Sequence, residues 1–125
     1  MDITPRVPAG RSLIQGYGGG GFRISGVRVA GSRLVFPERN LPWDVTDVDA
    51  ITIASLSEVV AGAEPVSILL IGCGQEGRRP NPAIAEAMRE HGVVVEWMAT
   101  GAACRTFNVL IGEERPVAAA LIAVD

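Results

Sequence analysis

The chain has 125 residues, of which 48% are hydrophobic and 20% are charged. This length suits one domain, and this composition excludes disorder as a description of the whole chain. The formal net charge of −3 gives no reason to expect a nucleic acid or an anionic membrane surface as partner.

The first eleven residues, MDITPRVPAGR, contain two prolines and an acidic residue. We therefore expect a flexible arm over residues 1–11, followed by a single α/β domain over residues 12–125. The arm lacks the apolar core of a secretory signal, and the longest apolar runs, of about eight residues, are too short to span a bilayer. Two cysteines are too few for a disulfide scaffold, so we expect free thiols in a reducing cytoplasm.

Short apolar runs broken by glycine fill residues 13–36. Alternation of apolar and charged residues around Arg23 and Arg28 predicts half-buried antiparallel strands joined by tight glycine turns. Pro37 and Pro42 then indicate an irregular link that carries Trp43. The sequence thus predicts a small antiparallel β layer at the N-terminal end of the domain.

From residue 50 onward, the pattern changes to strands alternating with helices. The apolar runs predict strands at 50–54, 66–72, 93–99 and 116–124, and helices at 55–62, 81–92 and 100–114. The helix at 81–92 is well delimited, with Asn81 as N-cap, Pro82 in the first turn and Gly92 after its end. This alternation predicts an α/β fold with a mixed, mainly parallel sheet flanked by helices.

The stretch SILLIGCGQEG at 67–77 contains G-x-G-x-x-G after a strand, the pattern of a dinucleotide-binding turn, and Glu96 follows near the position of a ribose-binding acid. In such a turn, the helix opens inside the glycine motif. Here Pro80 disfavours helix before the Asn81 cap, which comes four residues after the motif ends. We therefore interpret the glycines as a loop that needs positive φ angles. The alternative is an anion-binding nest beside Arg78 and Arg79.

Two loops are expected to meet at one edge of the sheet. If the strands that end near Ile71 and Trp97 are parallel neighbours, the loops after both lie at the carboxyl edge, where open α/β folds bind ligands. The candidate ligand- or partner-binding residues are Gly72, Cys73 and Gly74 in the first loop, and Thr100, Cys104, Arg105 and Asn108 in and after the second. Thr100, Cys104 and Asn108 share one helix face.

Cys104 admits two interpretations. Near a helix N-terminus and beside Arg105, its thiol pKa could be lowered enough to make a thiolate nucleophile. The favoured alternative is a small apolar residue packed under the helix.

No coherent catalytic set is present. The one histidine, His91, ends a helix before Gly92 and is expected to cap it. Two cysteines thirty-one residues apart match no zinc spacing, and the acidic run at 44–49 lacks the glycine and distal glutamate of a calcium loop. We therefore expect no catalytic residues, no metal and no cofactor.

The C-terminal half carries a family pattern. It consists of T-x-x-A-C-x-T-F-N followed by E-x-R, at Thr100, Ala103, Cys104, Thr106, Phe107, Asn108, Glu113 or Glu114, and Arg115. GYGGGGFRISG at 16–26, GSRLVFP at 31–37 and the Trp after the proline-containing link fit the same pattern. Over residues 13–124, the chain resembles the family of mitochondrial respiratory complex I assembly factor 3 and its bacterial relatives of unknown function.

This resemblance implies a three-layer α/β domain with an added small β layer. It also implies a non-enzymatic interaction domain whose partners are subunits or assembly factors of respiratory complex I, the NADH:ubiquinone oxidoreductase. The alternative from the residues is a small-molecule or anion-binding domain, with or without enzymatic activity, that uses the crevice at the carboxyl edge of the sheet. A homodimer is also compatible with a small domain that has apolar edge strands.

Overall fold

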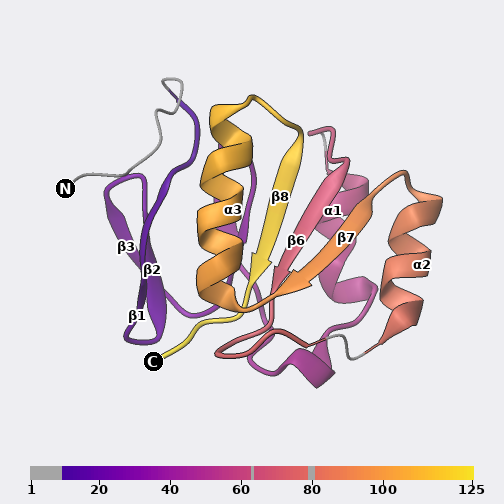
Figure 1. The fold of residues 1–125 in the computed structure, drawn as a ribbon, viewed down its shortest axis with the longest axis horizontal. Helices are drawn as coiled ribbons and strands as arrows, with labels where there is room; N and C mark the ends of the chain where they lie inside the picture. The colour runs from indigo at the N-terminus through magenta and orange to yellow at the C-terminus, as the bar shows by residue number, and fades with distance from the viewer. Residues whose placement is uncertain (1–9, 63, 79–80) are drawn as a thin grey trace.

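A computed structural model describes residues 10–62, 64–78 and 81–125 of the chain (Figure 1). The arm expected over residues 1–11 lies outside the described residues, except for Gly10 and Arg11. The described residues form one three-stranded sheet, one five-stranded sheet and three α-helices. The predicted mixed α/β class is therefore confirmed.

The small sheet is an antiparallel meander of β1 (Ile14–Gly18), β2 (Gly21–Ile24) and β3 (Val27–Ala30). The β1–β2 turn needs glycine, because Gly19 and Gly20 have φ angles of +59° and +78°. The predicted N-terminal antiparallel layer is therefore present, with its glycines in the turns.

The main sheet has the strand order β5-β4-β8-β6-β7. Its strands are β4 (Arg33–Val35), β5 (Asn40–Pro42), β6 (Ile68–Gly72), β7 (Val94–Met98) and β8 (Val117–Leu121). The strand β6 runs parallel to both β7 and β8, whereas β4 is antiparallel to both β8 and β5.

Two strands differ from the prediction. The run around β4 was expected in the N-terminal layer, and residues 37–43 were expected to be irregular. Instead, β4 joins the main sheet and β5 forms inside the link. The reason is that Leu34 and Val35 are both buried, so adjacent side chains on both faces of β4 need cover, which only the interior of a two-sided sheet provides.

The helices complete three layers (Figure 1). The helix α3 (Thr100–Gly112) packs on β6 and β8 on one face of the main sheet, and the small sheet lies beside it against the same hydrophobic cluster. The helices α1 (Ser57–Ala61) and α2 (Pro82–Glu90) contribute Val59, Ile84 and Met88 to the cluster on the opposite face. The layering that the family resemblance implied is thus found.

The strand expected at 50–54 is absent. Two short 3-10 helices, Val48–Ala50 and Ala54–Leu56, flank this segment instead. The Asp47 side chain accepts a hydrogen bond from the Asp49 backbone N–H, and the side chains of Thr52 and Ser55 each accept from the other's backbone N–H. These local side-chain bonds compete with strand pairing and hold the chain in turns.

The strand β7 was expected to be buried, and it lies at the edge of the sheet. Val94 is 56% exposed, while Val95 and Trp97 pack partly against the cluster that contains α2. The apolar run VVVEWM suggested burial on both faces, but among the described elements a helix covers one face of β7.

Candidate functional site

The loop after β6 and the start of α3 meet at the carboxyl edge of the main sheet, as predicted. The Thr100 hydroxyl donates to the Ile122 carbonyl (2.7 Å) and accepts from the Gly74 N–H (2.9 Å), and the Thr100 N–H donates to the Gly74 carbonyl (2.8 Å). A Cβ at Gly72 would lie 3.0 Å from the Thr100 Cα, so glycine permits this close approach. Gly74 has a φ of +97°. This junction ties three chain segments together.

The glycine loop does not have the geometry of a dinucleotide-binding turn. The helix α2 begins at Pro82, and the Asn81 side chain caps it by accepting from the Ala83 N–H at 2.9 Å. The glycines at 72–77 therefore precede the helix instead of opening it, as the sequence predicted. Arg79 and Pro80, which entered that prediction and its anion-nest alternative, lie outside the described residues.

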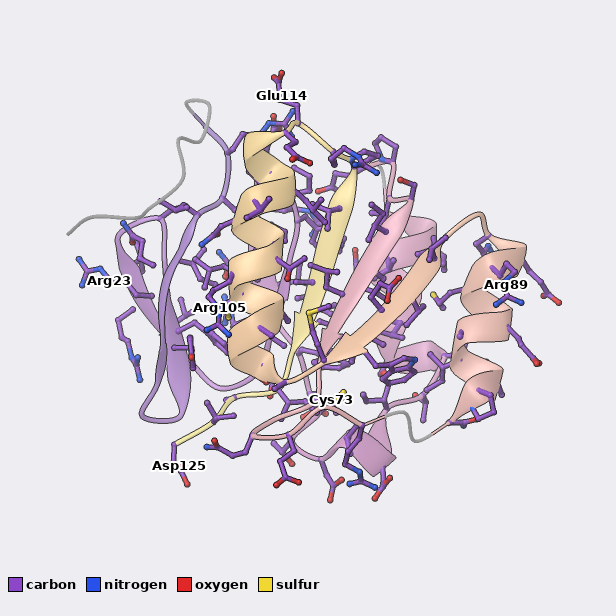
Figure 2. The ribbon with its side chains drawn as sticks, viewed as in Figure 1. Arg23, Cys73, Arg89, Arg105, Glu114 and Asp125 are labelled. Atoms are coloured by element: carbon purple, nitrogen blue, oxygen red, sulfur yellow. The ribbon has the colours of Figure 1, made fainter. Side chains whose placement is uncertain are left out.

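Cys73 lies next to this junction, at the carboxyl end of β6 (Figure 2). Its thiol donates to the Arg78 carbonyl at 3.3 Å, and burial raises the pKa of the thiol. The Arg78 guanidinium lies 3.4 Å from an Asp49 carboxylate oxygen, with both side chains more than half exposed. The cation beside the glycine loop thus has a carboxylate partner.

A shallow cavity of about 300 Å³ opens at this edge. It is lined by Thr46, Asp47, Val48, Cys73, Gly74, Gln75, Arg78, Ile122, Ala123, Val124 and Asp125. Among the described residues, its charged lining consists of Asp47, Asp125 and Arg78, and these three side chains together give no net positive field for an anion. Of the predicted site residues, only Cys73 and Gly74 line it.

The inward face of α3 is buried as predicted, and its polar groups are bonded to the chain's own backbone. Asn108 accepts from the Ile14 N–H (2.9 Å) and donates to the Ile14 carbonyl (2.8 Å), so it holds β1 against α3. Burial raises the pKa of Cys104 to about 12, against the opposing influence of Arg105. The raised pKa favours the interpretation of Cys104 as a packed apolar residue over that of a thiolate nucleophile.

Arg105 points away from the carboxyl-edge junction, toward the small sheet (Figure 2). Its guanidinium lies 3.4 Å from the Tyr17 hydroxyl. A Cβ at Gly101 would overlap the Tyr17 ring, so Gly101 makes room for this contact between α3 and β1.

The predicted site residues therefore fall into three places. Gly72, Cys73, Gly74 and Thr100 meet at the carboxyl edge, Cys104 and Asn108 lie beneath α3, and Arg105 lies on its outer side. A binding role for these seven residues stays a prediction.

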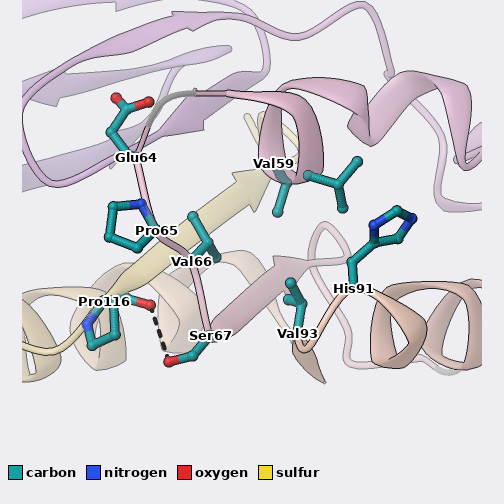
Figure 3. Close-up of a pocket in the computed structure, with 9 residues that line it drawn as sticks. Val59, Glu64, Pro65, Val66, Ser67, His91, Val93 and Pro116 are labelled. Carbon is teal, nitrogen blue, oxygen red and sulfur yellow. Dashed lines mark hydrogen bonds between the residues drawn. The ribbon is translucent and has the colours of Figure 1, made fainter.

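Sequence reasoning missed a groove of mixed polar and apolar lining at the opposite, amino end of the sheet (Figure 3). Its volume is about 260 Å³, and its lining is Val59, Val60, Glu64, Pro65, Val66, Ser67, His91, Val93 and Pro116. His91 is the C-cap residue of α2, and its backbone N–H donates to the Met88 carbonyl at 2.9 Å. Capping of the helix carbonyls by the His91 side chain stays a prediction. The Arg39 guanidinium pairs with Glu64 and lowers the pKa of that carboxyl.

A second groove that the sequence did not reveal lies between α2 and the outer side of β7. Its volume is about 470 Å³, and its lining is Asn81, Pro82, Ala85, Arg89, Val95, Glu96 and Trp97. Both grooves depend on how helices pack against the sheet. The residue pattern along the chain carries no local signal for them.

Two observations concern metals and membranes. Within residues 10–62, 64–78 and 81–125, no three His, Cys, Asp or Glu side chains gather as potential metal ligands. In the same ranges, no helix has both the length and the apolar character needed to cross a membrane.

Comparison with known protein families shows which family the chain belongs to. Residues 14–122 match the model of a family described as "Protein of unknown function (DUF498/DUF598)". The chain belongs to this family. Its match includes both sheets and the T-x-x-A-C-x-T-F-N segment of α3, so the family pattern covers the elements that define the fold.

Named relatives include an assembly factor. The chain is 40% identical over 110 residues to "NADH dehydrogenase (ubiquinone) 1 alpha subcomplex assembly factor 3" of Xenopus tropicalis, covering 88% of this chain and 60% of the relative. The chain thus spans about 60% of the length of this relative. It is also 36% identical over 122 residues to an uncharacterized protein of Rhodobacter capsulatus, covering 96% of this chain and 93% of that protein.

A solved structure shares the whole fold. The crystal structure described as that of an outer membrane protein from Bartonella henselae superposes with a TM-score of 0.85 at 38% identity. The match covers 96% of this chain and all of that one. The superposition therefore extends over nearly all of this chain's elements.

Proposed function

We propose that this chain is a non-enzymatic interaction domain that binds subunits or assembly factors of respiratory complex I. The observation that carries the proposal is the 40% identity, over 88% of the chain, to a relative named as an assembly factor for NADH dehydrogenase. Because the chain spans only 60% of that relative, the proposal concerns the part that the two share.

The family motif on α3 supports a structural role for its polar residues. Thr100 and Asn108 direct their side-chain hydrogen bonds to the backbone at Gly74, Ile122 and Ile14. Cys104 is buried and has a raised pKa. Groups engaged in this way stabilise a fold and are poorly placed to act on a substrate. Polar side chains bonded to the chain's own backbone in this way suit a binding scaffold.

The test is affinity purification of the tagged chain from its native host, followed by mass spectrometry. Recovery of complex I subunits or assembly factors, above the level from a host with the tag alone, is the expected result. A gene deletion should lower the amount of assembled complex I on native gels and the membrane NADH oxidation rate. Unchanged assembly and oxidation, in a host that relies on this enzyme, would rule the proposal out.

The second candidate is a small-molecule or anion site at the carboxyl edge. The cavity of about 300 Å³ there is the observation that favours it, because it contains Cys73 and Gly74 of the predicted set. A metabolite mixture screened by ligand-detected NMR tests it. Gly74→Ala, which is strained at a φ of +97°, should reduce any genuine signal, and a signal that persists unchanged would count against this site.

A further inference from the structure

Among the described residues, β7 forms an open edge of the main sheet and carries little of the usual protection. Edge strands present unpaired N–H and C=O groups to other chains, and proteins commonly protect them with short strands, prolines, charges or covering elements. The opposite edge, β5, has three residues and ends in Pro42. The small sheet is covered by α3 along β1 and carries Arg28 in its edge strand β3. In contrast, β7 has five residues, VVEWM, without proline, and its one protective charge is Glu96.

The outward backbone groups of β7 can be assigned from the ladder with β6. The Val94 N–H donates to the Ser67 carbonyl at 2.9 Å, and the Met98 carbonyl accepts from the Cys73 N–H at 2.8 Å. In a parallel pair, the N–H and C=O of one residue face the same neighbour, and this direction alternates along the strand. Val95 and Trp97 therefore direct their N–H and C=O groups outward. No other described strand pairs with them.

The helix α2 provides cover for one side of an added strand. Pro82, Ala85 and Arg89 line the helix wall of the groove of about 470 Å³, and Val95 and Trp97 line its sheet side. In Figure 1, α2 flanks β7 at the unpaired edge of the main sheet. A strand paired to β7 could therefore place alternate side chains into this groove, in the mode of β-strand addition.

The charge on β7 decides between a second copy of the chain and a different partner. Glu96 is the central residue of β7, is exposed and has no ion pair among the described residues. Antiparallel pairing of two β7 strands over their full length would set Glu96 opposite its own copy. Like charges directly opposite one another destabilise a sheet pair, and an opposite charge stabilises it. A strand with Lys or Arg at this position fits better.

We propose that the open edge of β7 docks an extended segment of a partner protein. The segment adds a strand to the main sheet, places apolar side chains in the groove beside α2 and sets a Lys or Arg opposite Glu96. This inference rests on the proposed interaction function and assigns its surface.

The test uses two short synthetic peptides of alternating valine and threonine, one with a central lysine and one with a central glutamate. Fluorescence anisotropy measures the affinity of each peptide for the protein. Wild-type protein should bind the lysine peptide about fivefold tighter than the glutamate peptide. Glu96→Lys should reverse this preference. Glu90→Lys, the same change at an exposed position of α2, is the matched control and should behave as wild type.

Amide hydrogen exchange locates the binding. The outward N–H groups of Val95 and Trp97 should exchange rapidly in the free protein and slow down when the lysine peptide is bound. A peptide with methylated backbone nitrogens on its pairing side should not bind. Absence of binding at millimolar lysine peptide, protection elsewhere only, or a preference that Glu96→Lys leaves unchanged would each overturn the assignment.

Capture of complex I subunits by the tagged protein separates the two proposals. Wild type that captures none would contradict the proposed function. Equal capture by wild type and Glu96→Lys would leave that function standing and overturn the docking surface. A wild-type dimer that Val95→Pro converts to monomer would assign the edge to a second copy and also overturn the partner assignment.

Discussion

The environment of the two cysteines predicts their reactivity. Burial raises the pKa of Cys104 to about 12 and also raises that of Cys73. Near neutral pH, both thiols should therefore be almost entirely protonated, and the thiolate is the reactive form. We expect slow labelling by a thiol reagent in the native protein and complete labelling in denaturant. Rapid native labelling, assigned with Cys104→Ser and Cys73→Ser, would contradict the packed interpretation.

Asn108 predicts a large loss of stability when its amide is removed. Its side chain is the hydrogen-bond partner for both the N–H and the C=O of Ile14 in a buried contact. Asn108→Leu would leave these backbone groups without that partner and should lower the free energy of unfolding by about 2 kcal/mol. Urea denaturation measures this. Val109→Ala, on the exposed side of α3, is the control, and equal effects of the two substitutions would contradict the role given to Asn108.

At the scale of elements, α2 and α3 end in the same motif with different residues. At the end of α2, Gly92 (φ +76°) donates to Arg89, and Val93 donates to the Met88 carbonyl. At the end of α3, Glu114 (φ +58°) donates to Ile111, and Arg115 donates to the Leu110 carbonyl. Both are Schellman ends, in which glycine is the usual left-handed residue. Glu114 therefore holds a conformation that costs free energy.

The two left-handed residues, Gly92 and Glu114, predict opposite changes in stability when they are substituted. Glu114→Gly should raise the free energy of unfolding by roughly 0.5–1 kcal/mol, because it relieves the left-handed strain. Gly92→Ala should lower it by about 1 kcal/mol for the same reason. Urea midpoints of the two variants and wild type provide the measurement. A loss of stability in Glu114→Gly would mean that the exposed carboxylate, seen beyond the end of α3 in Figure 2, makes a stabilising interaction.

Features of the fold could be predicted from the sequence where neighbouring residues determine them, and could not where distant parts of the chain do. The limits of α2 were predictable because Asn81, Pro82 and Gly92 act on their own backbone. The strand expected at 50–54 was wrong because its alternating isoleucines outweighed, in the sequence pattern, the turn-forming side chains around them. The place of β4 could not be predicted, since it depends on pairing with β8 near the other end of the chain.

The same distinction holds for the candidate site. The meeting of Gly74 and Thr100 followed from the rule that parallel strands bring their loops to one edge. The inward face of α3 followed from helical spacing. The open edge of β7 could not be found in this way. An apolar run does not reveal whether a further strand of the same chain will pair with it.

At the scale of the whole molecule, the main sheet couples two hydrophobic clusters. Leu69 and Ile71 of β6 lie in the cluster with α1 and α2, whereas Leu70 lies in the cluster with α3 and the small sheet. The strand β8 alternates in the same way. Because both clusters share these two central strands, the small sheet and the α2 layer should unfold as one cooperative unit.

Phe22→Leu tests this coupling from one face of the molecule to the other. Phe22 is fully buried in the small-sheet cluster, while Trp43 and Trp97 report on the opposite cluster. The smaller side chain should lower the free energy of unfolding by about 1–2 kcal/mol. The urea midpoint should fall equally by tryptophan fluorescence and by far-ultraviolet circular dichroism. An unchanged fluorescence midpoint beside a shifted circular dichroism transition would mean that the small sheet unfolds separately. The main sheet would then be stable without its N-terminal layer.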